Sequence, residues 1–446
     1  THKVTLSTKV AGIEASASPA ELRRAAVLKL GEARLGKAER GRCLSALAAV
    51  GESEKEEGRR SLPVLRRGLE GEAERDSWDP FGAHDGVLSH PEAVGELARR
   101  FGADYGFSIT ALEEYGGCPF AFLCHVVLGV EAPVEPPEEL EAVDEGTILH
   151  RTLRQFYAER RERSRDVRIR EDEVGTAQEH IRRIADAHLD RFHRRNPDLN
   201  EGLFRLQREA MHELLGEFVR AEAAARGTDR LGMIPRFFEV AFGLSVKRGV
   251  ADPRSTSKRL VVESADGPSI GIVGKIDRID VTEGVVGEAG RRGFRVIDYK
   301  RGRAPSGTRG IEEGTAFQMP VYLLAARDVI LADETLEAVD ARFYGLRDMK
   351  ARPALALLKG TATGVQPVAG AEALMDAAVE HIRDYVGAIR KGQFPVLRRG
   401  TQACPGYCEF REICRYSELR AGKKTGDFKP WFEHRHPSER TEGGDE

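Results

Sequence analysis

The sequence predicts an α/β domain in which helices cover the strands of a sheet. Four runs rich in β-branched and aromatic residues follow one another between residues 235 and 300 and are joined by turn-forming sequence, which is typical of strands. Apolar residues recur at helical spacing before these runs, in 146–165, and after them, in 372–392. At 446 residues the chain is too long for one ordinary core, so we expect two or three domains.

The composition is that of a soluble protein. With 41% hydrophobic and 32% charged residues, and no apolar run of about eighteen residues, we expect a globular, cytoplasmic protein without a transmembrane helix. The formal net charge of −3 argues against a uniformly basic surface, although a local basic groove around an acidic centre is compatible with it. Nothing near Thr1 has the charged and apolar regions of a signal peptide, so we expect a portion of something larger.

The ends of the chain differ from its middle. Residues 21–35 and 41–50 have helical apolar spacing, and Cys43 lies among apolar residues, where a buried thiol is expected. The acidic, Pro-rich segment 131–145 is predicted to be a loop or linker. The expected divisions are a helical N-terminal region, a main domain and a mobile tail, in residues 1–90, 91–418 and 419–446.

A helix is predicted to begin after Ser108, whose hydroxyl can cap it, and to end at the pair Gly116-Gly117. This ending presents Cys118 at a helix junction, where Pro119 can start the next segment. Cys124 lies instead in an all-apolar run and is expected to pack in a core.

The stretch 270–300 is predicted to be an antiparallel hairpin that carries chemistry at its end. Because residues two apart on a strand point the same way, Phe294 and Val296 share a face with Asp298 and Lys300. An apolar row that ends in a carboxylate and an ammonium indicates a core face opening into a site.

Asp277, Asp298 and His150 are candidate metal ligands. Two hard oxygen ligands and one imidazole, with open positions left over, suit Mg²⁺ or Mn²⁺ held for phosphate chemistry. Lys300 beside such an ion can orient a water, help to deprotonate it and neutralise charge that develops on a phosphate. The spacing alone equally favours a surface hairpin with ordinary ion pairs, such as Asp277 with Arg278.

Other polar residues extend this candidate site. Gln318 and Tyr322 are four apart on a predicted helix and therefore share one face. The loop after Lys300 has no acidic residue and carries three basic ones: Arg301, Arg303 and Arg309. The helical stretch 171–227 carries basic clusters that are either a solvated face or a phosphate-contacting surface.

Six motifs occur in the order found in one known family: SITALEEYGGCP (108–119), GTILH (146–150), GKIDRID (274–280), DYK (298–300), QMPVY (318–322) and the terminal cysteines. In these motifs the chain resembles the RecB-like nucleases of the PD-(D/E)XK superfamily, most closely the nuclease domain of AddB-type subunits of bacterial helicase–nuclease machines. The resemblance covers roughly residues 78–418 and implies a restriction-endonuclease-like core with a mixed central sheet flanked by helices. Ile276-Asp277 stands where the superfamily has Pro-Asp, a substitution common in this branch.

The resemblance also implies roles and an activity. Its metal ligands correspond to His150, Asp277, Asp298 and the backbone carbonyl of Tyr299, its catalytic lysine to Lys300, and its positioning motif to Gln318 and Tyr322. The implied activity is an Mg²⁺- or Mn²⁺-dependent DNA exonuclease acting on single strands from a helicase partner in break repair. The sequence contains no G-x-x-x-x-G-K-[ST] loop, so a partner or a missing segment would supply the motor. The alternative is a non-catalytic DNA-binding scaffold subunit, which the intact carboxylates and Lys300 argue against.

Four of the six cysteines are candidates for a second centre: Cys118, Cys404, Cys408 and Cys414. Six cysteines are too sparse for a disulfide scaffold, and four thiolates suit either tetrahedral zinc or a [4Fe–4S] cluster. The resemblance implies the iron–sulfur cluster, with a structural role as a staple. The three residues between Cys404 and Cys408 depart from the family's usual two.

Overall fold

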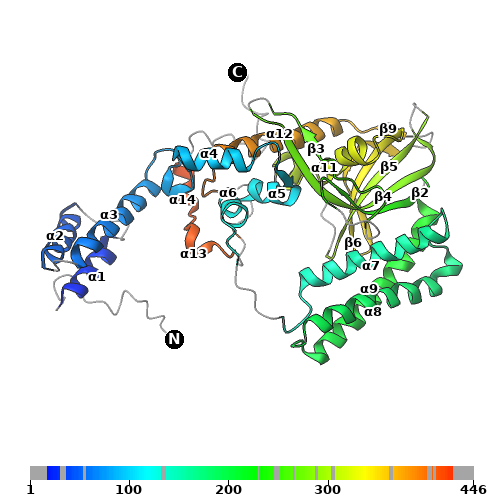
Figure 1. Ribbon diagram of the computed structural model, residues 1–446, viewed down its shortest axis with the longest axis horizontal. Coiled ribbons are helices and arrows are strands. Elements are labelled where there is room, and N and C mark those ends of the chain that lie inside the picture. The colour runs from blue at the N-terminus through cyan, green and yellow to red at the C-terminus, as the bar shows by residue number, and fades with distance from the viewer. Residues whose placement is uncertain are drawn as a thin grey trace, which may run out of the picture. The chain divides into compact units, whose positions relative to one another are not determined.

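The computed structural model describes most of the chain (Figure 1). The described residues are 18–30, 37–53, 57–131, 137–229, 231–245, 251–264, 267–286, 290–302, 307–360, 365–398, 404 and 408–424. They divide into two compact units, one formed by residues up to Asp85 together with the segment from Glu418, and the other by Gly86–Ser417.

The first unit is helical. It contains helices α1 (Pro19–Leu30), α2 (Lys37–Ser53), α3 (Glu57–Arg75), the short η3 (Ala83–Asp85) and α14 (Glu418–Lys423). Cys43 is fully buried beside Ala26 and Leu47, which confirms the buried thiol. Lys424 Nζ lies 2.7 Å from Asp85 Oδ2 in a buried ion pair. Residues 419–424, expected to begin a mobile tail, are therefore largely helical and anchored, and 425–446 lie outside the described residues.

A mixed sheet forms the centre of the second unit, as predicted. Among the described residues it has seven strands: β1 (Gly106–Ser108), β2 (Met233–Phe242), β3 (Leu260–Val262), β4 (Ile270–Val286), β5 (Arg291–Lys300), β6 (Leu336–Gly345) and β7 (Lys350–Ala356). The long β4 pairs with β1 in parallel and with β2, β3 and β5 antiparallel, while β5 and β6 are parallel. The predicted hairpin is thus β4 and β5. A small ribbon is formed by β8 (Leu358–Gly360) and β9 (Val365–Pro367).

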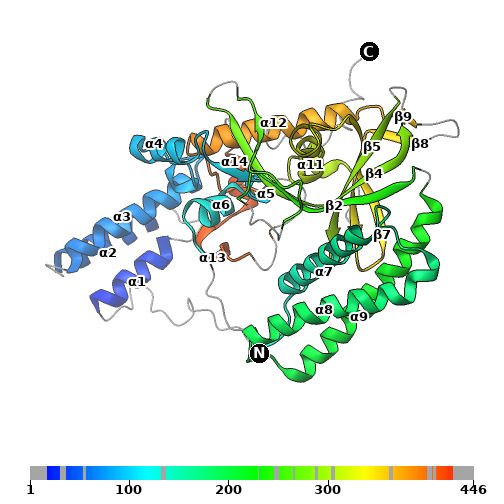
Figure 2. The same ribbon diagram turned by 45° about the vertical axis from the view of Figure 1, so that its right-hand side comes forward.

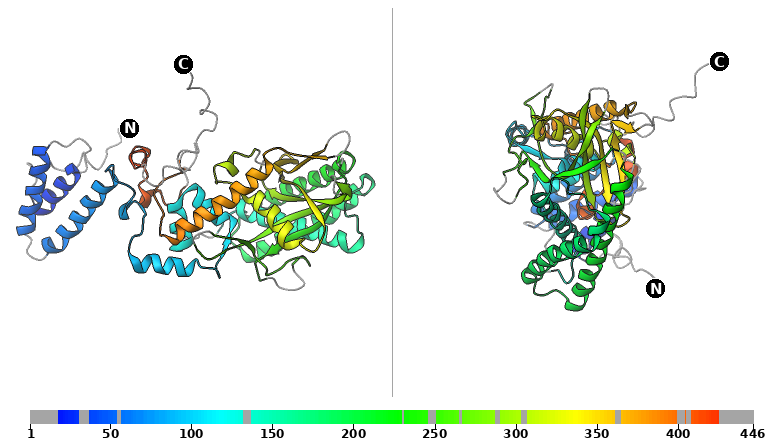
Figure 3. Two further views of the ribbon diagram at one scale, coloured as in Figure 1. Left: turned by 90° about the horizontal axis from the view of Figure 1, so that it is seen from above. Right: turned by 90° about the vertical axis from the view of Figure 1, so that its right-hand side faces the viewer.

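Helices cover both faces of this sheet (Figure 3). One face packs against α4 (Pro91–Arg100), α5 (Ile109–Gly117), α11 (Gln318–Ala325) and α12 (Ala371–Arg390), around a core that includes Ile276 and Phe294. The other face packs against α7 (Ala142–Arg163), α8 (Val174–Arg195) and α9 (Glu201–Thr228), around a core that includes Phe218, Phe238 and Tyr299. Alternation along the strands supplies an apolar row to each face, which explains why both helical layers form.

Shorter elements connect these layers. They are α6 (Pro119–Phe122), the π-turn η4 (Leu123–Val127), η5 (Glu171–Glu173), α10 (Arg309–Glu312), the π-turn η6 (Ala326–Ile330) and α13 (Arg411–Cys414). The predicted helix after Ser108 is confirmed, because the Ser108 hydroxyl accepts from Ala111 N and the helix ends at Gly117.

Helix α7 differs from its prediction. It begins at Ala142, inside the segment 131–145 that was expected to be a loop, so His150 lies in its third turn rather than its first. Asp144 and Glu145 lie in the first turn of α7, where carboxylates interact favourably with the helix dipole, and this explains the early start.

Candidate active site

The two candidate carboxylates lie on neighbouring strands. Asp277 is on β4 and Asp298 on β5, and the pairing of Arg278 with Ile297 places the two acids side by side. Both are buried, with relative exposures of 8% and 5%. Arg278 bonds to Asp280 and not to Asp277, so the alternative of a surface hairpin with a pair between Asp277 and Arg278 is wrong.

Asp277 is held by two protein donors. Its Oδ2 accepts a 2.9 Å hydrogen bond from the backbone N–H of Tyr299, and its Oδ1 lies 3.1 Å from Nδ1 of His150. Burial alone would lower the pKa of His150, but the charge of Asp277 and its hydrogen bond raise it to about 9. The structure therefore brings His150 from α7 to Asp277, as predicted from the sequence.

Asp298 is held by the other predicted residues. Lys300 Nζ lies 2.7 Å from Asp298 Oδ2, and Gln318 Nε2 donates to Asp298 Oδ1 at 2.9 Å. Lys300 Nζ also donates to Gln318 Oε1 at 3.3 Å, so the three side chains form a closed triangle. Burial, reinforced by the charge of Asp277, raises the pKa of Asp298 to about 6.

Tyr322 lies beside this triangle. It is largely buried, and burial followed by the charge of Asp298 raises the pKa of its phenol, while a hydrogen bond with Gln318 opposes the rise. Figure 2 shows the elements that supply these groups, with α11 over one face of β4 and β5 and α7 on the other. We call this group of His150, Asp277, Asp298, Lys300, Gln318 and Tyr322 the carboxylate site.

The donor chemistry of the carboxylate site fits a hard divalent cation. Two carboxylates and an imidazole meet at one place, and the buried Asp298 Oδ2 makes an ion pair with Lys300 but no well-aligned hydrogen bond. Among the described residues, no group of three or more His, Cys, Asp or Glu side chains is already arranged to hold a metal ion. Metal binding here, and the role of the Tyr299 carbonyl in it, stay predictions.

Two acidic residues near the site were not predicted from the sequence. The first is Glu113 on α5, which is mostly buried and whose Oε1 accepts from the backbone N–H groups of Phe317 and Gln318 at 2.7 and 2.8 Å. Burial raises the pKa of Glu113 to about 7, although those two donors oppose the rise. The only local sign of Glu113 was its place in an early helical turn.

The second missed residue is Glu239 of β2. Its backbone has φ of 49°, in the left-handed region that a non-glycine residue rarely adopts inside a strand. Its carboxylate lies 3.1 Å from Lys275 Nζ and 3.8 Å from Arg154, and its charge contributes to the raised pKa of His150. The run FFEVAF contains one acid among apolar residues, which was the available signal.

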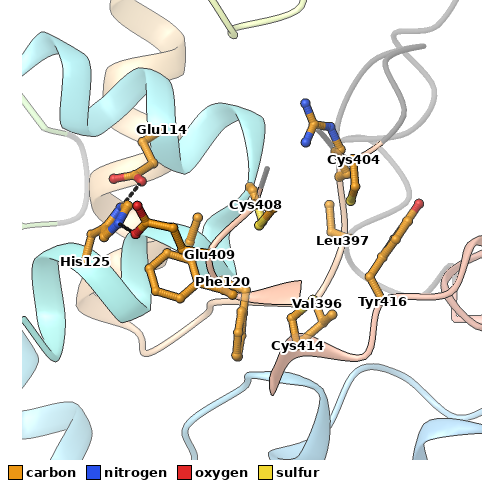
Figure 4. A pocket seen from close by; sticks show the side chains of 14 residues that line it. Glu114, Phe120, His125, Val396, Leu397, Cys404, Cys408, Glu409, Cys414 and Tyr416 are labelled. Carbon is orange, nitrogen blue, oxygen red and sulfur yellow. Dashed lines mark hydrogen bonds and ion pairs between the residues drawn. The ribbon is translucent and has the colours of Figure 1, made fainter. Parts of the chain in front are cut away.

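The four candidate cysteines line one cavity of about 270 Å³ (Figure 4). We call it the cysteine pocket; its thiols come from the junction of α5 and α6, from α13 and from the segment before it, in Cys118, Cys404, Cys408 and Cys414. Burial raises the pKa of Cys118 to about 11. Four sulfur donors around one cavity fit zinc or a cluster chemically, and neither is distinguished by the geometry. Cys124 is buried and does not line the pocket.

A histidine joins the two chain segments of this pocket. His125 Nδ1 lies 2.5 Å from Glu114 Oε1, and His125 Nε2 lies 3.4 Å from Glu409 Oε2. Figure 4 shows His125 between the two carboxylates. Because Glu114 is on α5 and Glu409 precedes α13, this bridge ties the C-terminal cysteine segment to α5.

The predicted basic residues are distributed around these sites. Arg301 forms an ion pair with Glu145 at the start of α7, and Arg309 forms one with Glu313. Arg303 lies outside the described residues. Arg191 and Arg195 line a second cavity of about 440 Å³ beside α7 together with two acids, Glu141 and Asp144.

Comparison with known families decides the classification. The family model described as the PD-(D/E)XK nuclease superfamily matches residues 106–415, a span that includes every residue of both sites. The chain belongs to this superfamily. Among the described helices, none is both long and apolar enough to cross a bilayer.

Curated relatives of this nuclease are named as the B-type subunit of an ATP-dependent helicase/deoxyribonuclease. The one from Moorella thermoacetica is 25% identical over 422 residues, which cover 81% of this chain and 34% of that protein. The one from Acetivibrio thermocellus is 27% identical over 254 residues, which cover 55% of this chain and 20% of that protein. The chain thus spans about a third of the length of the first relative, and the predicted resemblance to AddB-type subunits is confirmed.

Proposed function

We propose that this chain is a metal-dependent DNA exonuclease that hydrolyses single strands delivered by a helicase partner during double-strand break processing. The observation that supports it most is the buried pair of Asp277 and Asp298 with Lys300 beside it, in a chain of the PD-(D/E)XK superfamily. The relatives named as helicase/deoxyribonuclease subunits support the DNA substrate and the motor partner.

The residues would divide the chemistry as follows. His150, Asp277, Asp298 and the Tyr299 carbonyl would hold Mg²⁺ or Mn²⁺, which when bound supplies Lewis-acid stabilisation and a more acidic water. Lys300, restrained by Asp298 and Gln318, presents an ammonium that orients the attacking water and neutralises charge on the phosphate.

Gln318 and Tyr322 support this arrangement from α11. The amide of Gln318 contacts both Asp298 and Lys300, so it fixes the distance between the acid and the ammonium. Tyr322 fills the space beside them and excludes water from the buried carboxylates. In the cysteine pocket, the four thiols would hold a [4Fe–4S] cluster that staples the C-terminal segment to α5.

Cleavage of labelled single-stranded DNA tests the proposal. The wild-type chain, Asp298→Ala and Lys300→Ala are each incubated with Mg²⁺ or Mn²⁺ in the presence of the motor partner. We expect degradation by the wild type alone, with losses on the order of 10²–10⁴-fold in the variants. Equal degradation by all three, or none by the wild type, would instead favour the non-catalytic DNA-binding scaffold.

A further inference from the structure

Two adjacent glutamates of α5 point to different parts of the second unit. Glu114 pairs with His125 beside the cysteine pocket. Glu113 reaches α11 instead, where one carboxylate oxygen accepts two backbone N–H groups, those of Phe317 at 2.7 Å and Gln318 at 2.8 Å. The two contacts span about two hundred residues of sequence and join α5 directly to α11.

The contact supplies what the start of α11 lacks. The first N–H groups of a helix have no partner within the helix, and Phe317, the N-cap of α11, offers no side-chain acceptor. The carboxylate of Glu113 accepts from these N–H groups and places negative charge at the positive end of the helix dipole. Glu113 is therefore the cap of α11, provided from another helix.

Close packing holds α5 against the segment that leads into α11. A Cβ atom added to Gly116 would lie 2.1 Å from the carbonyl oxygen of Gly314, so only glycine permits this approach. The same Gly314 carbonyl accepts a 2.8 Å hydrogen bond from the hydroxyl of Tyr385 on α12. The backbone before Gln318 is thus clamped between two helices while Glu113 fixes its amides.

The residue placed in this way is Gln318, which contacts both reacting-site groups. Its Nε2 donates to Asp298 at 2.9 Å and its Oε1 accepts from Lys300 at 3.3 Å. A shift at the start of α11 would change both distances together.

We propose that Glu113 is a positioning residue for phosphodiester hydrolysis, which acts by fixing the start of α11 so that Gln318 holds Asp298 and Lys300 in register. The inference rests on the proposed nuclease function of the same site. Glu113 itself touches neither substrate nor metal, and its effect passes entirely through Gln318.

Steady-state cleavage by Glu113 variants tests the proposal. We expect Glu113→Ala to lower kcat by about 10- to 100-fold, because displacements near 1 Å at a reacting site have effects of this size, with KM changed by less than about twofold. Glu113→Gln keeps an acceptor oxygen at the same place and is expected to restore kcat to within about threefold of wild type. Equal damage by Glu113→Ala and Glu113→Gln would overturn the proposal.

A double-mutant cycle separates positioning from a general structural effect. In a Gln318→Ala background, Glu113→Ala is expected to change kcat by less than about twofold, because the residue through which it acts is already gone. Full additivity of the two losses would overturn the proposal. If Glu113→Ala does not fold, Glu113→Asp replaces it in the cycle, since its shorter side chain cannot reach both amides.

Hydrogen exchange provides a readout that does not depend on cleavage. In Glu113→Ala the backbone amides of Phe317 and Gln318 are expected to exchange faster, while Glu114→Gln on the same helix leaves their rates unchanged. Unchanged exchange in Glu113→Ala would refute the capping contact. An inactive wild type with the expected exchange pattern would count against the nuclease proposal and not against this contact.

Discussion

The carboxylate site and the cysteine pocket lie in the same unit but are held in different ways. In the carboxylate site the protein's own groups hold every charged side chain, since His150 pairs with Asp277 and Lys300 with Asp298. In the cysteine pocket the thiols surround a cavity, and Cys414 Sγ makes only a long 3.8 Å contact with the carbonyl of Arg411. The first site is organised by the fold, whereas the second would be completed by what binds the sulfurs.

The chain connectivity explains this difference. Asp277 and Asp298 are on paired strands, so the register of one hairpin brings them together. Cys118 and Cys404 are almost three hundred residues apart, and their meeting closes a very long loop. Burial also raises the pKa of Cys118 to about 11, so its thiol is protonated at neutral pH unless a cation displaces the proton. A ligand of the pocket therefore adds stability, while a ligand of the carboxylate site adds chemistry.

The largest expected effect is a loss of activity without a loss of stability. Asp298→Asn keeps the shape of the side chain and an acceptor for Gln318, but it removes a buried charge. We expect cleavage to fall by about 10²–10⁴-fold while the free energy of unfolding stays equal or rises. Denaturant unfolding and DNA cleavage are measured on the same preparations.

The control for this prediction is Asp328→Asn, which removes a carboxylate that is partly exposed and paired with its neighbour Arg327. It should change neither quantity. A clear fall in the stability of Asp298→Asn would contradict the view that the fold does not depend on this carboxylate.

The next effect should have the opposite pattern. Cys414→Ser removes one thiol of the cysteine pocket, and we expect a stability loss on the order of 2–5 kcal/mol, the range for removing a covalent constraint on a long loop. Iron and zinc content, visible absorbance and denaturant unfolding are measured together. Bound iron with broad absorbance identifies a cluster, and colourless protein with zinc identifies a tetrahedral site.

Cys124→Ala serves as the comparison for the cysteine pocket, because Cys124 is buried nearby without lining the cavity. It should keep the metal content of the wild type. Full metal content and stability in Cys414→Ser would show that the pocket does not act as a staple.

The sequence predicts the carboxylate site better than its surroundings, for a physical reason. The alternation of Phe294, Val296, Asp298 and Lys300 is local, and a strand converts it directly into one face. The contact of Glu113 with α11 depends on how two helices pack across the unit, so no local pattern records it. The bridge from His125 to Glu409 escapes sequence reasoning for the same reason.

Boundaries of elements are predicted less well. The Pro-rich composition of 131–145 indicates a loop, but the first-turn acids allow α7 to begin at Ala142. At the other end, the polar segment after residue 418 indicates a tail, but Lys424 is buried against Asp85 and gives α14 an anchor. In both places a tertiary or terminal interaction outweighs composition.

The smallest expected effect concerns the histidine bridge of the cysteine pocket, through the variant His125→Gln. Burial alone would lower the pKa of His125, but Glu114 and Glu409 together raise it above its ordinary 6.5. A raised folded-state pKa means that the stabilisation is fully present below about pH 6.5 and is lost as the pH rises through the folded-state value. Because His125 is more than a third exposed, the difference between wild type and variant should stay below about 1 kcal/mol.

Unfolding at a series of pH values checks this dependence, with metal content held constant. The wild type should be more stable than His125→Gln at about pH 6, and the two should converge as the pH rises above neutrality. A difference that grows with pH would mean that His125 acts as a neutral acceptor and not as a cation between two carboxylates. Convergence would show that the protein contributes only a weak, pH-dependent clasp to the cysteine pocket, which leaves its main stabilisation to a ligand bound by the thiols.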